Sequence, residues 1–270
     1  MKYWKNTTTI DAYVPDLLDT VDAADAEIAV IGGKPIDVTV MPNLKGIFKC
    51  GVGTDNVPFE EAAKRGVEIG MPSEQTKRYI FEETANFAVY LVFKMLFNEI
   101  GQVDGWVKQS RGFLGNKKVL VIGQGNIGAH VSRKLEPSVD VLTFDVLQNS
   151  MDELKGLIQQ ADVISLHVPL IDETMHFMDA EKLAWMKDQA ALVNTARGPV
   201  VDEDALFAEI ESGRLRAAFD VFWQEPYEGK LKAFHPERFL MSPHVPSTCE
   251  HFLTGLGEDH VAFPANLEKV

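Results

Sequence analysis

Several features are scarce or missing in this sequence of 270 residues, and each absence excludes a class of protein. The two cysteines, Cys50 and Cys249, lie far apart and are too few for a disulfide framework or a cysteine-rich metal site, so we expect buried or inert thiols and no bound metal. Basic residues number 26 against 40 acidic ones, which gives a formal net charge of −14. A basic face for nucleic acid or for an anionic membrane is therefore not expected.

Long apolar segments are also missing. Residues 1–9 contain no apolar stretch of the kind found in secretory signals, and the most apolar segment, residues 87–97, is too short to span a bilayer and includes Lys94. The sequence has no internal repeat and no low-complexity tract. We therefore expect a cytoplasmic enzyme.

What is present is an ordinary globular composition, with 46% hydrophobic and 24% charged residues, in a chain long enough for one large or two modest domains. Short apolar runs alternate with amphipathic segments, which predicts parallel sheets covered by helices. The expected strands are residues 27–31, 44–50, 67–69, 119–122, 139–144, 162–166, 191–194, 217–219 and 239–242. The expected helices are residues 59–65, 79–100, 126–135, 151–160, 179–186 and 202–212, the second of them deeply buried.

Residues 118–145 contain the most informative pattern. The predicted strand at residues 119–122 is followed by Gly123, Gly125 and Gly128 in the spacing G-x-G-x-x-G, and then by a predicted helix. The first glycine permits a tight turn, the second lets the backbone approach a pyrophosphate, and the third lets the helix pack closely on the strand. The helix N-terminus offers unpaired N–H groups to the anion. This context predicts a dinucleotide site.

Asp145 indicates which dinucleotide binds. It ends the next predicted strand, where a carboxylate accepts hydrogen bonds from both ribose hydroxyls and repels a 2′-phosphate. Gln148 and Asn149 follow it, with no arginine or lysine. The sequence therefore favours NAD over NADP.

Polar residues follow several predicted strands, where ligands bind in open parallel sheets. Hydride transfer at a hydroxyl-bearing carbon needs a group that accepts the hydroxyl proton, and a cation that holds a carboxylate. His244 and Arg197 suit these roles, and Glu225 beside the histidine would hold its ring. We expect His167 and His176 to have structural roles or to support residues of the site from behind. We expect His130, His235, His251 and His260 to be surface or packing residues.

Six blocks carry a family resemblance: residues 51–57 (GVGTDNV), 119–128 (VLVIGQGNIG), 161–179 (ADVISLHVPLIDETMHFMD), 191–206 (ALVNTARGPVVDEDAL), 217–226 (AAFDVFWQEP) and 242–248 (SPHVPST). In these blocks the chain resembles the D-isomer-specific 2-hydroxyacid dehydrogenases, which include D-3-phosphoglycerate, glycerate and D-lactate dehydrogenases. The resemblance implies an α/β fold of two Rossmann-like lobes with parallel sheets. A shortened, flavodoxin-like substrate domain would comprise residues 1–84 and 246–270, and an NAD-binding Rossmann domain residues 85–245.

The resemblance also implies site residues. The catalytic set would be Arg197, Glu225 and His244, and the amides of Val52 and Gly53 would face the substrate carboxylate. A homodimer joined through the cofactor lobe and the long helix is implied in the same way. The cofactor contacts would be Gly123, Gln124, Gly125, Asn126, Ile127, Gly128, Asp145, His167, Pro169, Thr174, Thr195, Ala196 and Asp220.

Some alternatives stay open at this stage. Lys49 stands where phosphoglycerate dehydrogenases often have an arginine that can meet phosphate, and it is equally well interpreted as a solvated lysine at a strand end. The leading hypothesis is an NAD-dependent enzyme that interconverts a small D-2-hydroxy acid and its 2-keto acid. The alternatives are an NAD(H)-sensing, corepressor-like binding protein with little turnover, and a formate or phosphite oxidoreductase of the same fold. Formate enzymes usually have glutamine in the role of Glu225, which disfavours the last option.

Overall fold

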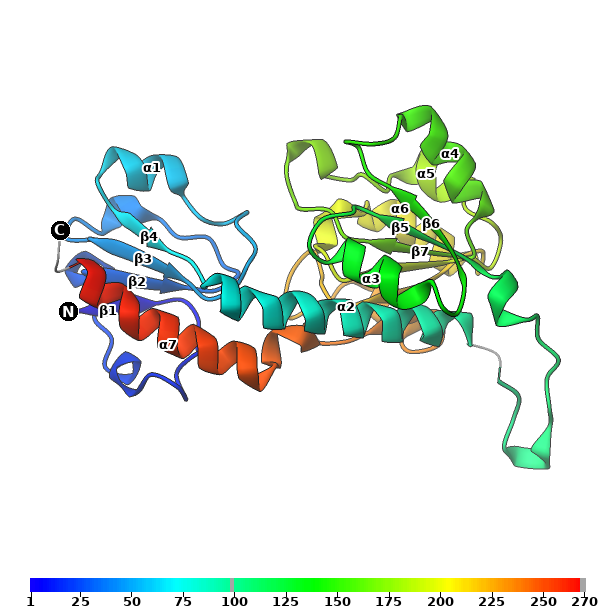
Figure 1. Cartoon of the computed structure of the whole chain (residues 1–270), viewed down its shortest axis with the longest axis horizontal. Helices are drawn as coiled ribbons and strands as arrows, with labels where there is room; N and C mark the ends of the chain where they lie inside the picture. The colour runs from blue at the N-terminus through cyan, green and yellow to red at the C-terminus, as the bar shows by residue number, and fades with distance from the viewer. Residues whose placement is uncertain (98–99, 268–270) are drawn as a thin grey trace. The chain divides into compact units, whose positions relative to one another are not determined.

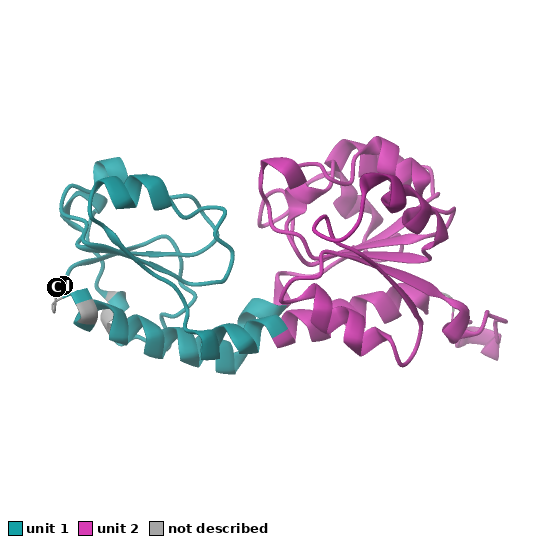
Figure 2. Cartoon of the chain, turned by 45° about the horizontal axis from the view of Figure 1, so that its top comes forward, with its two compact units in different colours: residues 1–81, 246–270 teal, residues 82–245 magenta. Residues whose placement is uncertain are grey.

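The computed structural model describes residues 1–97 and 100–267, and the chain forms two compact units (Figures 1 and 2). Unit 1 comprises residues 1–81 and 246–270, and unit 2 comprises residues 82–245. Each unit is an α/β body built on a parallel sheet, so the predicted fold class is confirmed. None of the helices among the described residues is long and apolar enough to cross a membrane.

Unit 1 contains a four-stranded sheet in the order β1-β2-β3-β4. Side chains on alternate positions of β2 and β3 pack on opposite faces: Phe48 lies with Phe252 and Leu256 of α7, whereas Ile47 lies with Ala62 of α1. The elements of this unit are β1 (Tyr3–Lys5), β2 (Ile28–Ile31), β3 (Gly46–Lys49), α1 (Phe59–Lys64), β4 (Glu68–Gly70), α7 (Glu250–Leu267) and the first part of α2 (Glu74–Leu96).

Unit 2 contains a six-stranded parallel sheet in the order β10-β9-β8-β7-β5-β6. Leu120 and Ile122 of β5 pack with the helices on one face, and Val119 and Val121 pack with α2 and α3 on the other. Its elements are β5 (Lys118–Ile122), α3 (Gly128–Leu135), β6 (Asp140–Phe144), α4 (Met151–Gln160), β7 (Val163–Leu166), α5 (Ala180–Trp185), β8 (Ala191–Asn194), α6 (Glu203–Glu211), β9 (Arg216–Phe219) and β10 (Phe239–Met241).

Local sequence signals explain where many of these elements begin. β7 and β8 are buried along their whole length, as expected for strands covered on both faces. Ser150 and Glu153 form a capping box at the start of α4. Asp202, the residue before α6, caps the helix by accepting a hydrogen bond from the backbone N–H of Ala205. These cap hydrogen bonds fix the residues at which α4 and α6 begin.

The structure corrects three expectations from the sequence. β1 and α7 were not predicted, and α2 begins at Glu74 and ends at Leu96 rather than spanning residues 79–100, of which 98 and 99 lie outside the described residues. Helix α7 includes Gly255, whose missing Cβ leaves room for Thr76 Oγ1 at 2.6 Å from the Cβ position. This glycine lowers helix propensity but permits close packing. Ala88, Leu91 and Val92 of α2 are buried as expected, whereas Tyr90 is 53% exposed, so burial of the whole helix between domains or at a subunit interface stays a prediction.

Candidate functional site

The strand order of unit 2 reverses between β5 and β7. The chain passes from β5 to β6 on one side and returns to β7 on the other, which makes a switch point at the carboxyl ends of these strands. Ligands of open parallel sheets bind in the crevice at such a point. The residues that follow β5, β7, β8 and β9 are those that the sequence singled out for a cofactor.

The glycine-rich loop after β5 has the geometry that a dinucleotide requires. Gly123 adopts φ +90°, a conformation that side chains rarely allow, and donates its N–H to Phe144 O. A Cβ on Gly128 would lie 1.8 Å from Gly123 O, so the helix and loop approach closely only because both residues lack side chains. A Cβ on Gly125, by contrast, would meet nothing within 4 Å. Open space at this position suits a pyrophosphate.

Asp145 follows β6 directly and is tied to the same loop. Its carboxylate accepts hydrogen bonds from the backbone N–H groups of Gln124 and Leu147, at 2.8 and 2.9 Å. The Gln124 side chain turns toward the protein, where its Oε1 accepts from Ser132 Oγ. Both the backbone N–H and the side-chain amide of Gln124 are therefore engaged within the protein. Asn126 and Ile127 form the turn that precedes α3.

The loop after β7 holds three further predicted contacts. His167 donates its backbone N–H to Ile122 O, and its ring Nε2 lies 2.8 Å from Ser165 Oγ. Burial lowers the pKa of His167 to about 3, so the ring is neutral at physiological pH and does not serve as a proton donor. Thr174 Oγ1 donates to Pro169 O at 2.6 Å and so closes the loop that carries Pro169.

The loop after β8 is shaped by Asn194, a buried residue that the sequence analysis did not select. Its side chain donates to Arg197 O at 2.8 Å and accepts from the backbone N–H of Ala196 at 3.0 Å. Thr195 lies between Asn194 and Ala196 in the chain and is buried. Within the described part of the chain, its Oγ1 has no hydrogen-bond partner. A buried hydroxyl without a partner carries a free-energy cost that a bound ligand would remove.

Asp220 follows β9 and is 1% exposed. Its Oδ1 accepts hydrogen bonds from Ser242 Oγ at 2.6 Å and from the backbone N–H of Val245 at 3.0 Å. Burial raises the pKa of Asp220 above its ordinary value, because removal from water disfavours the charged form. Ser242, which the sequence analysis did not select, thus links β10 to this carboxyl group.

His244 and Glu225 form a pair in which His244 Nδ1 lies 3.0 Å from Glu225 Oε2. A carboxylate only accepts hydrogen bonds, so Nδ1 carries the proton and Nε2 is the ring atom that can exchange a proton with a ligand. His244 adopts φ +54°, and its N–H donates to Asp220 O. Backbone conformations of this kind in non-glycine residues concentrate at functional sites.

Arg197 lies close enough to this pair to act on it electrostatically. Burial opposes ionisation of Glu225, but the hydrogen bond with His244 and the charges of His244 and Arg197 hold the pKa of Glu225 below its ordinary value. The Arg197 guanidinium donates to Ala196 O at 2.7 Å. Arg197, Glu225 and His244 all lie in unit 2, and the imidazole and the carboxylate are in direct contact.

A mostly apolar pocket of about 480 Å³ lies beside the pair and includes Glu225 and His244 in its wall. Phe222 and Tyr227 stack with ring centroids 5.0 Å apart and make part of the wall rigid. The remaining lining residues are Pro226, Met241, Ser242 and Pro243. Both members of the pair stay partly exposed, with side-chain exposures of 44% for His244 and 41% for Glu225. A ligand can therefore reach them.

The other predicted substrate contacts lie in unit 1. Val52 and Gly53 follow β3 and are partly exposed. Lys49 is the last residue of β3 and is only 4% exposed. Its interpretation as a solvated lysine is therefore wrong. Its ammonium group donates to Gly32 O at 2.5 Å and to Asn56 Oδ1 at 2.7 Å.

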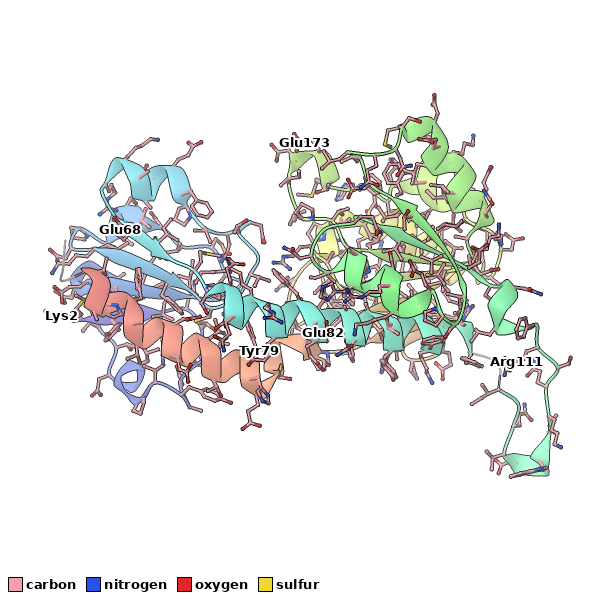
Figure 3. The ribbon with its side chains drawn as sticks, viewed as in Figure 1. Lys2, Glu68, Tyr79, Glu82, Arg111 and Glu173 are labelled. Atoms are coloured by element: carbon pink, nitrogen blue, oxygen red, sulfur yellow. The ribbon has the colours of Figure 1, made fainter. Side chains whose placement is uncertain are left out.

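Histidines outside the pair have the structural surroundings expected of them. His130 Nδ1 lies 2.9 Å from Glu82 Oε2, between α3 and the part of α2 where Figure 3 labels Glu82. His260 is buried in unit 1 against Tyr3 and Phe48, with ring centroids at 5.5 and 5.1 Å, so it is a packing residue. His235 Nδ1 accepts from the backbone N–H of Met241.

These observations fit NAD in unit 2. Gly125 leaves open space, Thr195 Oγ1 is buried without a hydrogen-bond partner among the described residues, and Asp145 is held at the end of β6.

No comparable signal in the sequence identified Asn194 or Ser242 as residues of the candidate site. In hindsight, each is a polar residue at or just after the end of an apolar strand, a position where the side chain can hydrogen-bond to the neighbouring loop.

Comparison with protein families matches residues 97–246 to the NAD binding domain of the D-isomer specific 2-hydroxyacid dehydrogenases. Among curated proteins, the chain is 32% identical over 262 residues to a glyoxylate reductase of Thermofilum pendens, with 86% of this chain and 75% of the relative covered. It is 31% identical over 217 residues to a hydroxypyruvate reductase of Thermotoga maritima, with 75% and 71% covered.

Among solved structures, the D-lactate dehydrogenase of Aquifex aeolicus, complexed with NAD and lactic acid, superposes with a TM-score of 0.80 at 23% identity. The alignment covers 100% of this chain and 96% of that one. This likeness concerns the fold. The matched NAD binding domain spans the glycine-rich loop and the strand ends described above, and NAD is therefore the cofactor.

Proposed function

The chain belongs to the D-isomer specific 2-hydroxyacid dehydrogenase family, and we propose that it interconverts a small D-2-hydroxy acid and its 2-keto acid with His244 as the acid/base. The observation that carries this proposal is the His244–Glu225 pair, with its 3.0 Å contact and with Arg197 nearby. A proton-exchanging ring and a fixed cation are the two protein groups that the reaction needs.

The roles follow from the atoms that each residue presents. Arg197 holds the substrate carboxylate and polarises the neighbouring carbonyl. In reduction, His244 Nε2 gives its proton to the carbonyl oxygen, and in oxidation it accepts the hydroxyl proton. Glu225 holds the ring by accepting from Nδ1 and stabilises its charged form. NADH supplies the hydride when bound.

We assign NAD to the domain of residues 85–245 and the substrate to the domain of residues 1–84 and 246–270. The contact of Asp145 with the Gln124 amide and the fit of the glycine loop support the predicted cofactor contacts in the first domain. The division of the chain after residue 81 and after residue 245 supports this assignment of domains. In the second domain, the amides of Val52 and Gly53 would bind the substrate carboxylate.

We also propose a homodimer joined through the NAD-binding domain and α2. In Figure 1 the segment between α2 and β5 runs away from the body of unit 2 and then returns, and Figure 3 labels Arg111 on it. Several large apolar side chains of α2 and this segment are exposed in the single chain, and burial against a second protomer would remove them from water. They include Tyr90 at 53%, Val103 at 82%, Trp106 at 75% and Phe113 at 74%.

The experiment is a panel of 2-keto acids assayed by oxidation of NADH, with NADPH in parallel. Relatives named for glyoxylate and hydroxypyruvate direct the choice of those two acids, joined by pyruvate and phosphohydroxypyruvate. We expect turnover of at least one acid with NADH and much weaker turnover with NADPH, because Asp145 would repel a 2′-phosphate. NADH binding without turnover of any acid would instead favour an NAD(H)-sensing protein.

A further inference from the structure

Lys49 occupies an unusual position for a lysine. It ends β3, a strand buried along its whole length, and it retains only 4% exposure. Burial of an ammonium group is costly unless hydrogen bonds replace its hydration. Its Nζ donates to Gly32 O at 2.5 Å and to Asn56 Oδ1 at 2.7 Å. These two acceptors belong to different loops at the carboxyl edge of the unit 1 sheet.

Asn56 completes a small network around this ammonium. Its Nδ2 donates to Gly32 O at 2.8 Å and to Lys34 O at 2.7 Å. Gly32 is also held from the other side, because its N–H donates to Asn6 Oδ1 at 2.9 Å. The turn after β2 is therefore fixed, and Lys49 and Asn56 together tie the loop of residues 51–57 to it.

We propose that Lys49 is a positioning residue, which holds the loop of residues 51–57 so that the Val52 and Gly53 amides are preorganised for the substrate carboxylate. This inference rests on the proposed function. It also changes the expected substrate class, because an ammonium engaged by two oxygens and 4% exposed has little surface left for a phosphate. Lys49 thus acts on every 2-keto acid through the loop and does not select phosphorylated ones.

The test compares Lys49→Met with Asn56→Ala, each assayed with hydroxypyruvate and phosphohydroxypyruvate. Displacement of a binding group by a fraction of an ångström to 1 Å is costly, so we expect KM to rise about tenfold or more for both acids in both variants. The Kd for NADH should change less than about twofold, because its predicted contacts lie in unit 2. Lys45→Met is the matched control, since Lys45 pairs with Glu27 at the surface and should leave KM unchanged.

A second readout does not depend on turnover. Hydrogen exchange at the amides of residues 51–57 should become about tenfold faster or more in Lys49→Met, and stay at the parent rate in Lys45→Met. A rise in KM confined to phosphohydroxypyruvate would make Lys49 a phosphate ligand and overturn the inference. Parent-like KM values in Asn56→Ala, or parent-like exchange in Lys49→Met, would also overturn it. Failure of the proposed function itself would be seen separately, as an inactive parent enzyme whose exchange still responds to Lys49→Met.

Discussion

The carboxyl edges of the two sheets are built in different ways. In unit 2, side chains at successive strand ends face the site, and other side chains fix them, as Ser242 fixes Asp220 and Glu225 holds His244. In unit 1, the groups proposed to meet the substrate are backbone amides, and Lys49, which precedes them at the end of β3, is buried and donates to Gly32 O. Functional side chains can be recognised in the sequence by residue type and position. A function that depends on backbone amides in a particular loop conformation is much harder to recognise.

This difference predicts that changes at the glycine-rich loop, Thr195 and the His244–Glu225 pair of unit 2 should act on cofactor binding and proton transfer, and that changes in the loop of residues 51–57 of unit 1 should act on the KM of the acid. The match to the NAD binding domain agrees with the comparison, because it spans residues 97–246 and so lies almost wholly within unit 2. Each prediction that follows is a way to break this division.

Among changes at the proposed NAD contacts, the largest effect is expected from Gly128→Ala. Its Cβ would lie 1.8 Å from Gly123 O, so the loop or α3 must shift, with a loss of about 1–3 kcal/mol in the free energy of unfolding. Gly125→Ala is the matched control for stability, because its Cβ meets nothing in the protein and should cost less than about 0.5 kcal/mol. Both should raise the Kd for NADH about tenfold or more, as measured by fluorescence titration. If Gly125→Ala binds NADH as tightly as the parent, the prediction that the pyrophosphate binds at this loop is wrong.

A smaller effect is expected from Thr195→Val. The buried Oγ1 has no hydrogen-bond partner among the described residues, so valine should leave thermal stability unchanged or slightly higher. Loss of one hydrogen bond to the cofactor should raise the Kd for NADH by up to about tenfold. Thr76→Val in unit 1 is the opposite case, because it removes the contact with Ser73 Oγ at 3.0 Å and should lower stability without altering NADH binding. Parent-like NADH affinity in Thr195→Val would contradict the assigned contact.

The smallest effect is expected from Asp220→Asn, whose effect on stability should depend on pH. Burial raises the pKa of Asp220 above its ordinary value of 3.8, so its contribution to stability is fully present below that value and is lost as the pH rises through the raised pKa. Asparagine does not titrate, and its Oδ1 can still accept from Ser242 Oγ and the Val245 N–H. Without NAD, the variant should therefore gain stability relative to the parent in urea unfolding as the pH rises from 3.8 through the raised pKa of Asp220. A difference that does not vary with pH would contradict this account.

Much of the fold followed from local patterns. The bounds of α4 and β8, residues 151–160 and 191–194, are those that the sequence pattern predicted. β1 was missed because three residues that include two aromatics and a lysine show no alternation. α7 was missed because Gly255, Gly257 and Pro264 weaken its helical pattern in the sequence. The helix packs on the sheet of its own unit, where Phe252 and Leu256 lie with Phe48.

The residues of the candidate site that could be predicted are those whose side chains have a distinctive chemistry. His244, Glu225 and Arg197 stand out because each follows or lies near a strand end and carries chemistry that hydride transfer needs. Asn194 and Ser242 could not be found in this way, because one polar residue at a strand end does not reveal which loop it will hold. Lys49 left two interpretations open, a phosphate contact and a solvated lysine, because the sequence does not show its burial or its hydrogen-bond partners.

The assignment of His244 is the central claim, and His244→Gln tests it most directly. Glutamine can still occupy the space beside Glu225 but cannot exchange a proton. We predict that kcat for the best 2-keto acid falls by roughly 10²- to 10⁴-fold while the Kd for NADH stays within about twofold of the parent. A kcat close to that of the parent, in a variant that binds NADH normally, would contradict the account.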